Sequence, residues 1–597
     1  MITKRISLLR AWMREQHLDA FIIPSADPHA GEYVAPLWKS REWITGFTGS
    51  AGTAVVTLEE AGLWTDSRYF IQAEQQLQGS GVVLHRSYQS ELTGEIPTWL
   101  AKRLVMGNSV GVDATLLTKA QADAIYAALA PKNILLVPCG DPFAEIWEDR
   151  PSLPMSHAEC YPKEYTGESA AERLTLLRRE LNALEADTLF VTPLDETAWT
   201  LHVRADDVTY TPVLISYMLV EADRATLFVH PDKCPQPVCD YLRSEGVSVA
   251  PYDEAFTALG KLTGRRILLP ATKTSWAAFE AVDKDQNTIL TAPSPLSWMK
   301  AVRTQAERDG LRQCMIQDGT AMVRFQKWLL EALAGGETVT EMSLDERLYA
   351  FRAEQPLFKD ASFATIAGYG ANAASPHYQA TPETDTTLQP RGYILLDSGG
   401  QYLNGTTDIT RTIVLGPLTE EEKTDYTLVL RGHINLSMAK FPKGTNGNQL
   451  DVLARMPLWE CGLQYLHGTG HGVGHYLSVH EATDVYQFRM SGASAPLMLH
   501  TTITNEPALY KAGSHGCRTE NQLLIVHDQT TAFGEFYRFE PLTLCPIDTE
   551  AIDLSLMHPH EIHWLNAYHQ QVFEKLSPHL TPEERDWLCT RCRKIDV

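Results

Sequence analysis

The chain has 597 residues, and its 51 Lys and Arg against 74 Asp and Glu give a net charge of −23 with neutral histidines. At about 150 residues per domain this length predicts three or four domains, and the 44% hydrophobic content excludes disorder of the whole chain. The acid excess argues against nucleic acid or an anionic membrane as the main partner. It leaves either a solvated acidic surface or carboxylates gathered around bound cations.

The N-terminus has no signal-peptide pattern, because charged residues such as Lys4, Arg5 and Arg10 interrupt it. We therefore predict a cytoplasmic protein, and since no apolar run approaches about 18 residues we expect no membrane partner. The ten cysteines are spread thinly, unlike those of a disulfide scaffold. Cys589-x-x-Cys592 has ligand-like spacing, but without a second pair we interpret it as a chance motif rather than a redox or zinc site.

The first 200 residues contain an internal repeat. Arg5-Ile-Ser-Leu-Leu-Arg10 resembles Arg173-Leu-Thr-Leu-Leu-Arg178, and Asp19-Ala-Phe-Ile-Ile23 resembles Asp187-Thr-Leu-Phe-Val191. Both pairs have the same offset, 173 − 5 = 168 and 187 − 19 = 168. In each copy an amphipathic helix pattern precedes a buried strand pattern. We therefore predict a duplicated α/β domain.

Two proline-rich stretches, residues 138–167 and 292–297, are typical of domain boundaries. They predict an N-terminal α/β domain over residues 1–160 and a second, related α/β domain over residues 161–298. The remaining residues, 299–597, would form a third domain with a C-terminal tail.

In this third domain the predicted helices and strands occur in separate blocks, which is typical of an α+β fold. The patterns predict helices over residues 304–333 (closed by Gly335-Gly336), 343–353 and 420–440. They predict strands over residues 393–397, 408–415 and 521–526. The whole chain is therefore predicted to be α/β and α+β.

Acidic side chains stand at the ends of predicted strands. Asp397 ends one strand and Asp408 begins the next, 408 − 397 = 11 residues later, so a ribbon turning back between them would place both carboxylates on one side. Glu506 ends a short β pattern, and Glu520 precedes an apolar strand. Each acid alone is more often a turn former or a solvated residue. Their shared setting at strand ends is what indicates a site.

A glycine-rich loop, His467-Gly-Thr-Gly-His471-Gly-Val-Gly-His475, lies between these acids and is followed by His480. Four carboxylates in one pocket would repel and raise each other's pKa unless cations were bound. Two divalent cations would balance four carboxylates. An oxygen-rich set with one imidazole suits a hard or borderline metal such as Mn²⁺.

Other histidine-based sites fit the sequence less well. Glycines make a helix across the His467–His471 loop improbable, and Asp484 stands where a zincin motif beginning at His480 needs its second histidine. No Lys-Ser or Lys-Thr follows the loop, so it is not a phosphate cradle. We interpret the histidines in His558-Pro-His560-Glu-Ile-His563 as surface or interface residues rather than metal ligands.

These residues resemble the five metal ligands of the pita-bread metallopeptidases in order and spacing. The matches are Asp397 in Leu-Leu-Asp-Ser-Gly, Asp408 in Gly-Thr-Thr-Asp-Ile-Thr-Arg-Thr, His471 in His-Gly-Thr-Gly-His-Gly-Val-Gly, Glu506 in Asn-Glu-Pro and Glu520 in Arg-Thr-Glu-Asn. Within that superfamily the chain resembles the three-domain aminopeptidase P (Xaa-Pro aminopeptidase) type. Its length, the segment Ile44 to Thr53 and the tail from Phe539 support that subtype. The departures, Cys517 and Thr519, do not fall on a ligand.

The resemblance implies two related N-terminal α/β domains followed by a C-terminal pita-bread catalytic domain. It also implies how two divalent metal ions are held. Asp397 and Asp408 would bind one metal, and Asp408 would also bridge to the second. His471 and Glu506 would bind the second metal. Glu520 would bridge both. A hydroxide bridging the two cations would attack the scissile carbonyl, because the cations lower the pKa of water. Glu506 would also be the proton shuttle.

The remaining site residues also follow from the resemblance. His377, His467 and His480 correspond to histidines that line the substrate site in the family, and would stabilise the tetrahedral intermediate or orient the substrate. Arg518 would hold Glu520. Tyr510 corresponds to an active-site tyrosine, and we include Tyr510 and Arg518, with His377 and His480, among the substrate-binding residues.

The implied substrates are peptides with proline second, from which the enzyme would release the N-terminal residue. Proline removes the amide hydrogen at the scissile bond, a donor on which general peptidases rely. Prolidase and methionine aminopeptidase share the ligands, but a prolidase is typically shorter and methionine aminopeptidase normally lacks two leading domains. A non-catalytic pita-bread binding module typically loses ligands, whereas all five are present here. Three-domain members are commonly homodimers, to which Trp43 or the tail could contribute.

Overall fold

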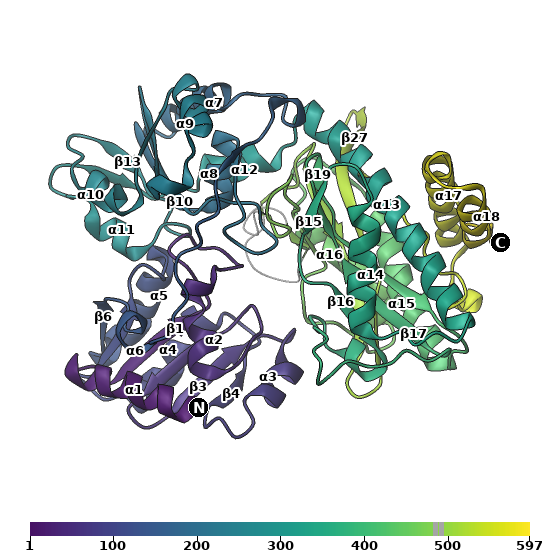
Figure 1. The fold of residues 1–597 in the computed structure, drawn as a ribbon, viewed down its shortest axis with the longest axis horizontal. Helices are drawn as coiled ribbons and strands as arrows, with labels where there is room; N and C mark the ends of the chain where they lie inside the picture. The colour runs from purple at the N-terminus through teal and green to yellow at the C-terminus, as the bar shows by residue number, and fades with distance from the viewer. Residues whose placement is uncertain (482–486, 489–494, 597) are drawn as a thin grey trace. The chain divides into compact units, whose positions relative to one another are not determined.

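The computed structural model describes residues 1–481, 487–488 and 495–596 (Figure 1). Its contacts divide the chain into two units, residues 1–163 with 168–297, and residues 164–167 with 298–597. The predicted boundary at residue 160 falls inside the first unit and stays a prediction. None of the helices in the described residues is long and apolar enough to cross a membrane.

The first unit contains two six-stranded sheets with the same strand order. In the first sheet, β4-β3-β2-β1-β5-β6, strand β1 (Ala20–Pro24) lies between antiparallel β2 (Thr53–Thr57) and parallel β5 (Ser109–Asp113). In the second, β12-β11-β10-β8-β13-β14, strand β8 (Thr188–Val191) lies between antiparallel β10 (Ser216–Glu221) and parallel β13 (Arg266–Leu268). The outer strands are β3 (Ala61–Thr65), β4 (Val83–Arg86), β6 (Leu135–Cys139), β11 (Ala225–Val229), β12 (Val247–Pro251) and β14 (Thr288–Leu290).

The offset of the sequence repeat recurs in the elements themselves. Helix α1 (Ile2–Glu15) and helix α7 (Ala170–Ala183) are related by 2 + 168 = 170 and 15 + 168 = 183. The strands that follow, β1 and β8, begin at 20 + 168 = 188. The prediction of two related α/β domains is therefore confirmed.

The central strands of both six-stranded sheets are expected to be apolar on both faces, because a sheet with parallel strands is usually covered by helices on each side. Strand β1 shows this directly: Phe21 and Ile23 belong to one core cluster with Leu9 and Met13 of α1, whereas Ala20 and Ile22 belong to another. The other helices of this unit are α2 (Ser40–Thr45), α3 (Phe70–Gln76), α4 (Ile96–Arg103), α5 (Lys119–Leu129), α6 (Phe143–Ile146), α8 (Leu194–Leu201), α9 (Gln236–Ser244), α10 (Ala255–Gly260) and α11 (Trp276–Ala281).

Both proline-rich stretches contain regular structure. Residues 138–167 include α6 and the short strand β7 (Glu159–Cys160), which pairs with β9 (Val203–Arg204). Helix α12 (Pro295–Ala301) begins inside the second stretch. Proline is tolerated at helix starts, so proline content alone overstated the irregularity of these segments.

The second unit begins with a long helix whose ends the sequence encodes. Helix α13 (Gln305–Ala334) starts with a capping box between Thr304 and Glu307, and Gly336 has φ +77° just beyond its end. This confirms the predicted 304–333 helix. The unit's other helices are α14 (Glu341–Ala353), α15 (Glu420–Ser437), α16 (Gly447–Trp459), α17 (Pro559–Leu576) and α18 (Pro582–Arg591).

The helix predicted over residues 420–440 is too long at its C-terminal end. Helix α15 ends at Ser437, and Lys440 instead begins β21 (Lys440–Pro442), which pairs with β28 (Gly534–Pro541). Phe441 is buried by this pairing. A long-range strand partner therefore overrides the local helical pattern.

The β part of the second unit includes three larger sheets, with orders β15-β18-β19, β16-β17-β20 and β21-β28-β27-β24. The described residues also form two two-stranded sheets, β22 (Gly470–His471) with β23 (Gln487–Phe488) and β25 (Ala508–Lys511) with β26. Strands β20 and β27 contact each other, and β17 and β20 both contact β26, so the sheets converge. The strands are β15 (Phe358–Ala361), β16 (Ile366–Tyr369), β17 (Tyr393–Ser398), β18 (Gly400–Tyr402), β19 (Gly405–Thr406), β20 (Ile409–Val414), β24 (Thr502–Asn505), β26 (His515–Arg518) and β27 (Asn521–Thr531).

Candidate metal centre

Asp397 and Asp408 are placed by one antiparallel ribbon. Asp397 is on β17 opposite Thr410 of β20, and Asp408 immediately precedes β20. Both carboxylates are therefore at the same end of the ribbon, as the 11-residue separation predicts. Both residues are buried.

The other acids come from strand ends in the neighbouring sheet. Glu506 follows the last residue of β24, and its backbone N–H donates to the Thr469 carbonyl at 2.8 Å. Glu520 stands between β26 and β27, and its N–H donates to the Thr410 carbonyl at 3.1 Å. These backbone contacts connect Glu520 to the ribbon of the two aspartates, and Glu506 to the glycine-rich loop.

His471 lies where these elements meet. It belongs to β22 (Gly470–His471), and its backbone N–H donates to Thr504 Oγ1 at 3.0 Å. Its Nε2 is 3.4 Å from Asp408 Oδ2 and 3.5 Å from Glu506 Oε1. Ligand atoms of Asp408, His471 and Glu520 all lie within 4.8 Å of one another. The structure thus brings three of the five sequence-predicted ligands into one such group, with Glu506 in contact with it.

The charges of this cluster interact strongly. Burial raises the pKa of Asp397 to about 7, with Asp408 and Glu506 adding to the shift against the opposing effect of Arg518. Burial and the neighbouring carboxylates also raise the pKa of Glu506 and, more strongly, of Glu520. Burial lowers the pKa of His471, but its hydrogen bond with Asp408 and the charge of Glu506 outweigh burial and raise that pKa to about 9.

The donor set fits divalent cations. Asp397 Oδ1 is buried and has no hydrogen-bond partner, which is costly for a carboxylate oxygen unless a cation binds it. The four carboxylates exceed the cationic groups that contact them, His471 and Arg518. Oxygen ligands with one imidazole are suited to hard or borderline divalent metals.

Arg518 supports this cluster differently from the sequence-based prediction. Its Nη2 is 2.6 Å from Asp397 Oδ2, so the direct ion pair is with Asp397 rather than Glu520. Arg518 Nε donates to Thr410 Oγ1 at 3.0 Å, and Thr410 Oγ1 donates to Glu520 Oε2 at 2.8 Å. The expected link to Glu520 therefore passes through Thr410. Arg518 is buried, and direct contact with a substrate stays a prediction.

The remaining predicted site residues lie around this cluster. Tyr510 is on β25 (Ala508–Lys511), and its hydroxyl contacts Arg518 Nη1 and lies 2.9 Å from His467 Nε2. The rings of His480 and His471 are 4.3 Å apart, edge to face. His377 is half-buried and follows Pro376, whose carbonyl accepts from Arg518 Nη2 at 3.3 Å.

Sequence reasoning missed a buried network behind His467. Thr469 Oγ1 donates to Asp451 at 2.5 Å, and Arg455 donates to the same aspartate at 2.6 Å and to the His467 carbonyl at 2.9 Å. Asp451 and Arg455 are on α16, which ends at Trp459, so the His467 loop is not helical. The signal available in the sequence was the spacing of Asp451 and Arg455, because an acid and a base four residues apart lie on one face of a helix.

The other histidine and cysteine motifs do not build a comparable group. In the part of the chain that the structure describes, neither His558-Pro-His560 nor Cys589-x-x-Cys592 belongs to a cluster of three potential metal ligands. His558 and His560 stack on each other at the start of α17, and Cys589 is exposed.

Comparison with known proteins places the chain in a family. Residues 309–527 match metallopeptidase family M24, and residues 535–595 match the C-terminal region of peptidase M24. Residues 5–146 and 149–307 each match a creatinase/prolidase N-terminal domain. A probable Xaa-Pro aminopeptidase P of Laccaria bicolor is 38% identical over 99% of this chain and 94% of its own length. The chain belongs to the aminopeptidase P family of M24 metallopeptidases. Aminopeptidase P2 of Arabidopsis thaliana, also 38% identical, is matched over 100% of this chain and 89% of the plant protein.

Solved structures agree with membership of the M24 family. The X-prolyl aminopeptidase of Caenorhabditis elegans, described as a cytosolic enzyme with a di-nuclear active site, is 31% identical and has a TM-score of 0.95, with 100% of both chains covered. A prolidase of Thermococcus sibiricus has a TM-score of 0.50 at 19% identity and covers 64% of this chain and 98% of its own. The second likeness shows a shared fold alone. The predicted fold, with two N-terminal creatinase-like domains and a C-terminal M24 domain, is confirmed.

Proposed function

We propose that this M24 metallopeptidase hydrolyses the bond between an N-terminal residue and a proline in the second position of a peptide. The observation that supports this most is the buried cluster in which His471 lies 3.4 Å from Asp408 and 3.5 Å from Glu506, with Glu520 beside them. The full-length relatives named as Xaa-Pro aminopeptidases support the proline preference.

Five side chains would hold two divalent cations. Asp397 and Asp408 would bind one cation, His471 and Glu506 the other, and Asp408 and Glu520 would bridge them. When bound, the pair would activate a water molecule near neutral pH and stabilise negative charge on the scissile carbonyl. Mn²⁺ suits this oxygen-rich donor set with one imidazole.

The protein's own groups would move the protons and orient the substrate. Glu506 is in contact with His471 and has a raised pKa, so its carboxylate is suited to accept a proton from the attacking water and pass it to the leaving proline nitrogen. His480 lies against His471, so it would face the same reacting atoms. Tyr510 and His467 form a hydrogen-bonded pair beside the cluster. With His377, they would position the peptide and stabilise developing charge.

A prolidase-type dipeptidase is the alternative with the same ligands. The two activities are separated by assaying a Gly-Pro dipeptide against an Xaa-Pro-Xaa tripeptide, with Mn²⁺ added to both. We expect hydrolysis of the tripeptide, releasing its first residue. Cleavage of the dipeptide alone would favour the prolidase, and failure to cleave either by fully metal-loaded protein would favour a binding module.

Location and assembly are also proposals. The C. elegans relative is described as cytosolic, and on this likeness we propose a cytoplasmic location. We propose a homodimer on the resemblance to three-domain members, and sedimentation velocity would distinguish a dimer from the 66.6 kDa monomer.

A further inference from the structure

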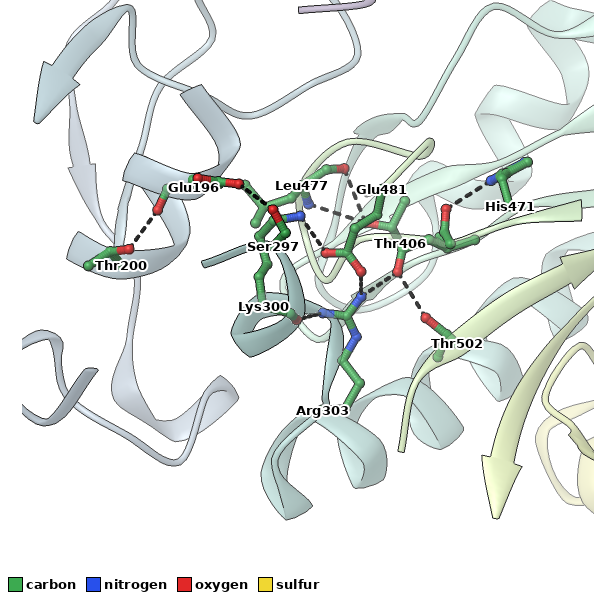
Figure 2. Close-up of polar contacts among 12 residues, drawn as sticks. Glu196, Thr200, Ser297, Lys300, Arg303, Thr406, His471, Leu477, Glu481 and Thr502 are labelled. Carbon is green, nitrogen blue, oxygen red and sulfur yellow. Dashed lines mark hydrogen bonds and ion pairs between the residues drawn. The ribbon is translucent and has the colours of Figure 1, made fainter. Parts of the chain in front are cut away.

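Another buried charge cluster lies at the C-terminal end of residues 471–481, a segment that begins within the glycine-rich loop and ends at Glu481. Glu481, which directly follows His480, has its side chain buried with those of Lys300 and Arg303 (Figure 2). Lys300 Nζ donates to Glu481 Oε1 at 2.8 Å, and Arg303 Nη2 contacts Oε2. Lys300 is on α12 and Arg303 lies just beyond it, 181 and 178 residues before Glu481.

Glu481 closes the segment that carries two of the site's histidines. Its backbone N–H donates to the Gly472 carbonyl at 2.8 Å, and the Gly474 N–H donates to the Ser478 carbonyl at 3.0 Å. The chain therefore folds back on itself, and His471 and His480 come together at its two ends with their rings 4.3 Å apart. The position of His480 thus depends on where Glu481 is fixed.

The segment needs external anchors because its glycines give it little stiffness of its own. A Cβ at Gly472 would lie 2.7 Å from the Glu481 carbonyl oxygen, so the close approach of the two strands requires glycine there. Arg303 Nη2 also contacts the Val473 carbonyl, which in addition accepts from Thr502 Oγ1 at 2.9 Å. One guanidinium therefore holds both arms of the folded segment, at the Val473 carbonyl and at Glu481. Figure 2 shows the contact between Arg303 and Glu481.

Burying the charges of Lys300, Arg303 and Glu481 costs desolvation free energy, and apolar side chains of similar size would fill the same space without that cost. The charged set is therefore better explained by the geometry that it fixes than by stability. The planar guanidinium of Arg303 fixes direction as well as distance, because its Nη1 contacts the Lys300 carbonyl while its Nη2 contacts Glu481 and the Val473 carbonyl. We propose that Lys300, Arg303 and Glu481 form a clamp of positioning residues that holds His480 against the metal-binding cluster. This inference rests on the proposed role of His480 in peptide hydrolysis.

A double-mutant cycle tests the clamp. The variants are Glu481→Gln, His480→Ala and the double variant, assayed as full-length, Mn²⁺-loaded protein on an Xaa-Pro-Xaa tripeptide. Glutamine keeps the size of the side chain but cannot pair with two cations. We expect Glu481→Gln to lower kcat about 10-fold with KM changed less than 2-fold, and to lower it less than 2-fold in the His480→Ala background, because residues acting as a unit are not additive. Exposed Glu337→Gln is the matched control.

Several outcomes would overturn the clamp. An equal kcat loss in both backgrounds would show that Glu481 acts independently of His480, and unchanged kcat in Glu481→Gln would show that no positioning is needed. Full activity of His480→Ala would refute the proposed role of His480 in peptide hydrolysis. This result differs from the two that refute the clamp alone, so the failure of the proposed function and the failure of the clamp can be told apart. If Glu481→Gln does not fold, Lys300→Met leaves a one-to-one pair of Arg303 with Glu481. We then expect a roughly 3-fold loss of kcat that again disappears without His480.

Discussion

Two of the buried charge clusters in the second unit, the metal-binding cluster and the clamp, differ in their balance of charge. The metal-binding cluster gathers Asp397, Asp408, Glu506 and Glu520 around His471 and Arg518, so negative charge is in excess. The clamp gathers Lys300 and Arg303 around Glu481, so each carboxylate oxygen already has a cationic partner. Buried charge that the protein leaves uncompensated indicates a ligand of opposite sign, whereas buried charge that is paired indicates a fixed geometry.

Removing the metals should have the largest effect, and it should act on the first cluster alone. We expect chelation to abolish peptide hydrolysis and to lower the free energy of unfolding, because binding at 100 times the Kd stabilises a protein by about 2.7 kcal/mol. Activity assays and thermal unfolding, before and after Mn²⁺ is restored, measure both effects. Equal inertness of the chelated and metal-replete proteins would contradict the peptidase proposal.

The pH dependence of metal binding follows from the same cluster. A metal binds deprotonated ligands, so protons compete with it. The pKa of Asp397 is raised to about 7 and that of His471 to about 9, so both hold protons over part of the range from pH 5 to 9. Metal affinity should therefore weaken as pH falls through this range. Titration calorimetry in buffers of different ionisation enthalpy should detect proton release, and binding without release would disprove the competition.

The next largest loss should follow Glu506→Gln. Glutamine keeps a ligating oxygen but cannot accept the proton, and general acid–base catalysis typically contributes about 10²- to 10⁴-fold. We expect kcat to fall by about 10³-fold with near-normal thermal unfolding. Glu481→Gln is the natural comparison, because it removes a carboxylate of the paired cluster and should cost far less. Retained activity in Glu506→Gln would refute the proton-transfer role.

The elements and ligands could be predicted where the signal is local. The capping box at Thr304, the 168-residue repeat and the strand ends at Asp397 and Glu506 are all written in short segments. The antiparallel pairing of β17 and β20 then follows from two apolar runs joined by a short connection. Each of these features depends on one short segment or, for the repeat and the ribbon, on the comparison of two such segments.

Partners from distant segments could not be predicted. The Arg518–Asp397 ion pair joins residues 121 apart, and Lys300–Glu481 joins residues 181 apart. An arginine beside a ligand motif does not reveal which acid it contacts, and a lysine in a predicted boundary does not reveal that it is buried. Tertiary packing also ended α15 at Ser437, because the following residues pair with β28.

A loss smaller than that of Glu506→Gln is expected at Tyr510, where a substitution tests how much orientation matters once the metal-binding cluster is complete. The Tyr510 hydroxyl contacts Arg518 and lies 2.9 Å from His467 Nε2, so Tyr510→Phe removes one bridge while the Arg518–Asp397 pair at 2.6 Å stays intact. We expect kcat to fall about 10-fold, which corresponds to roughly 1.4 kcal/mol of barrier, with metal content unchanged. Tyr349→Phe, at an exposed tyrosine, is the control. Loss of bound metal in Tyr510→Phe would instead mean that the bridge helps to hold Asp397 in place, and that the metal-binding cluster depends on its paired surroundings as well as on the cations.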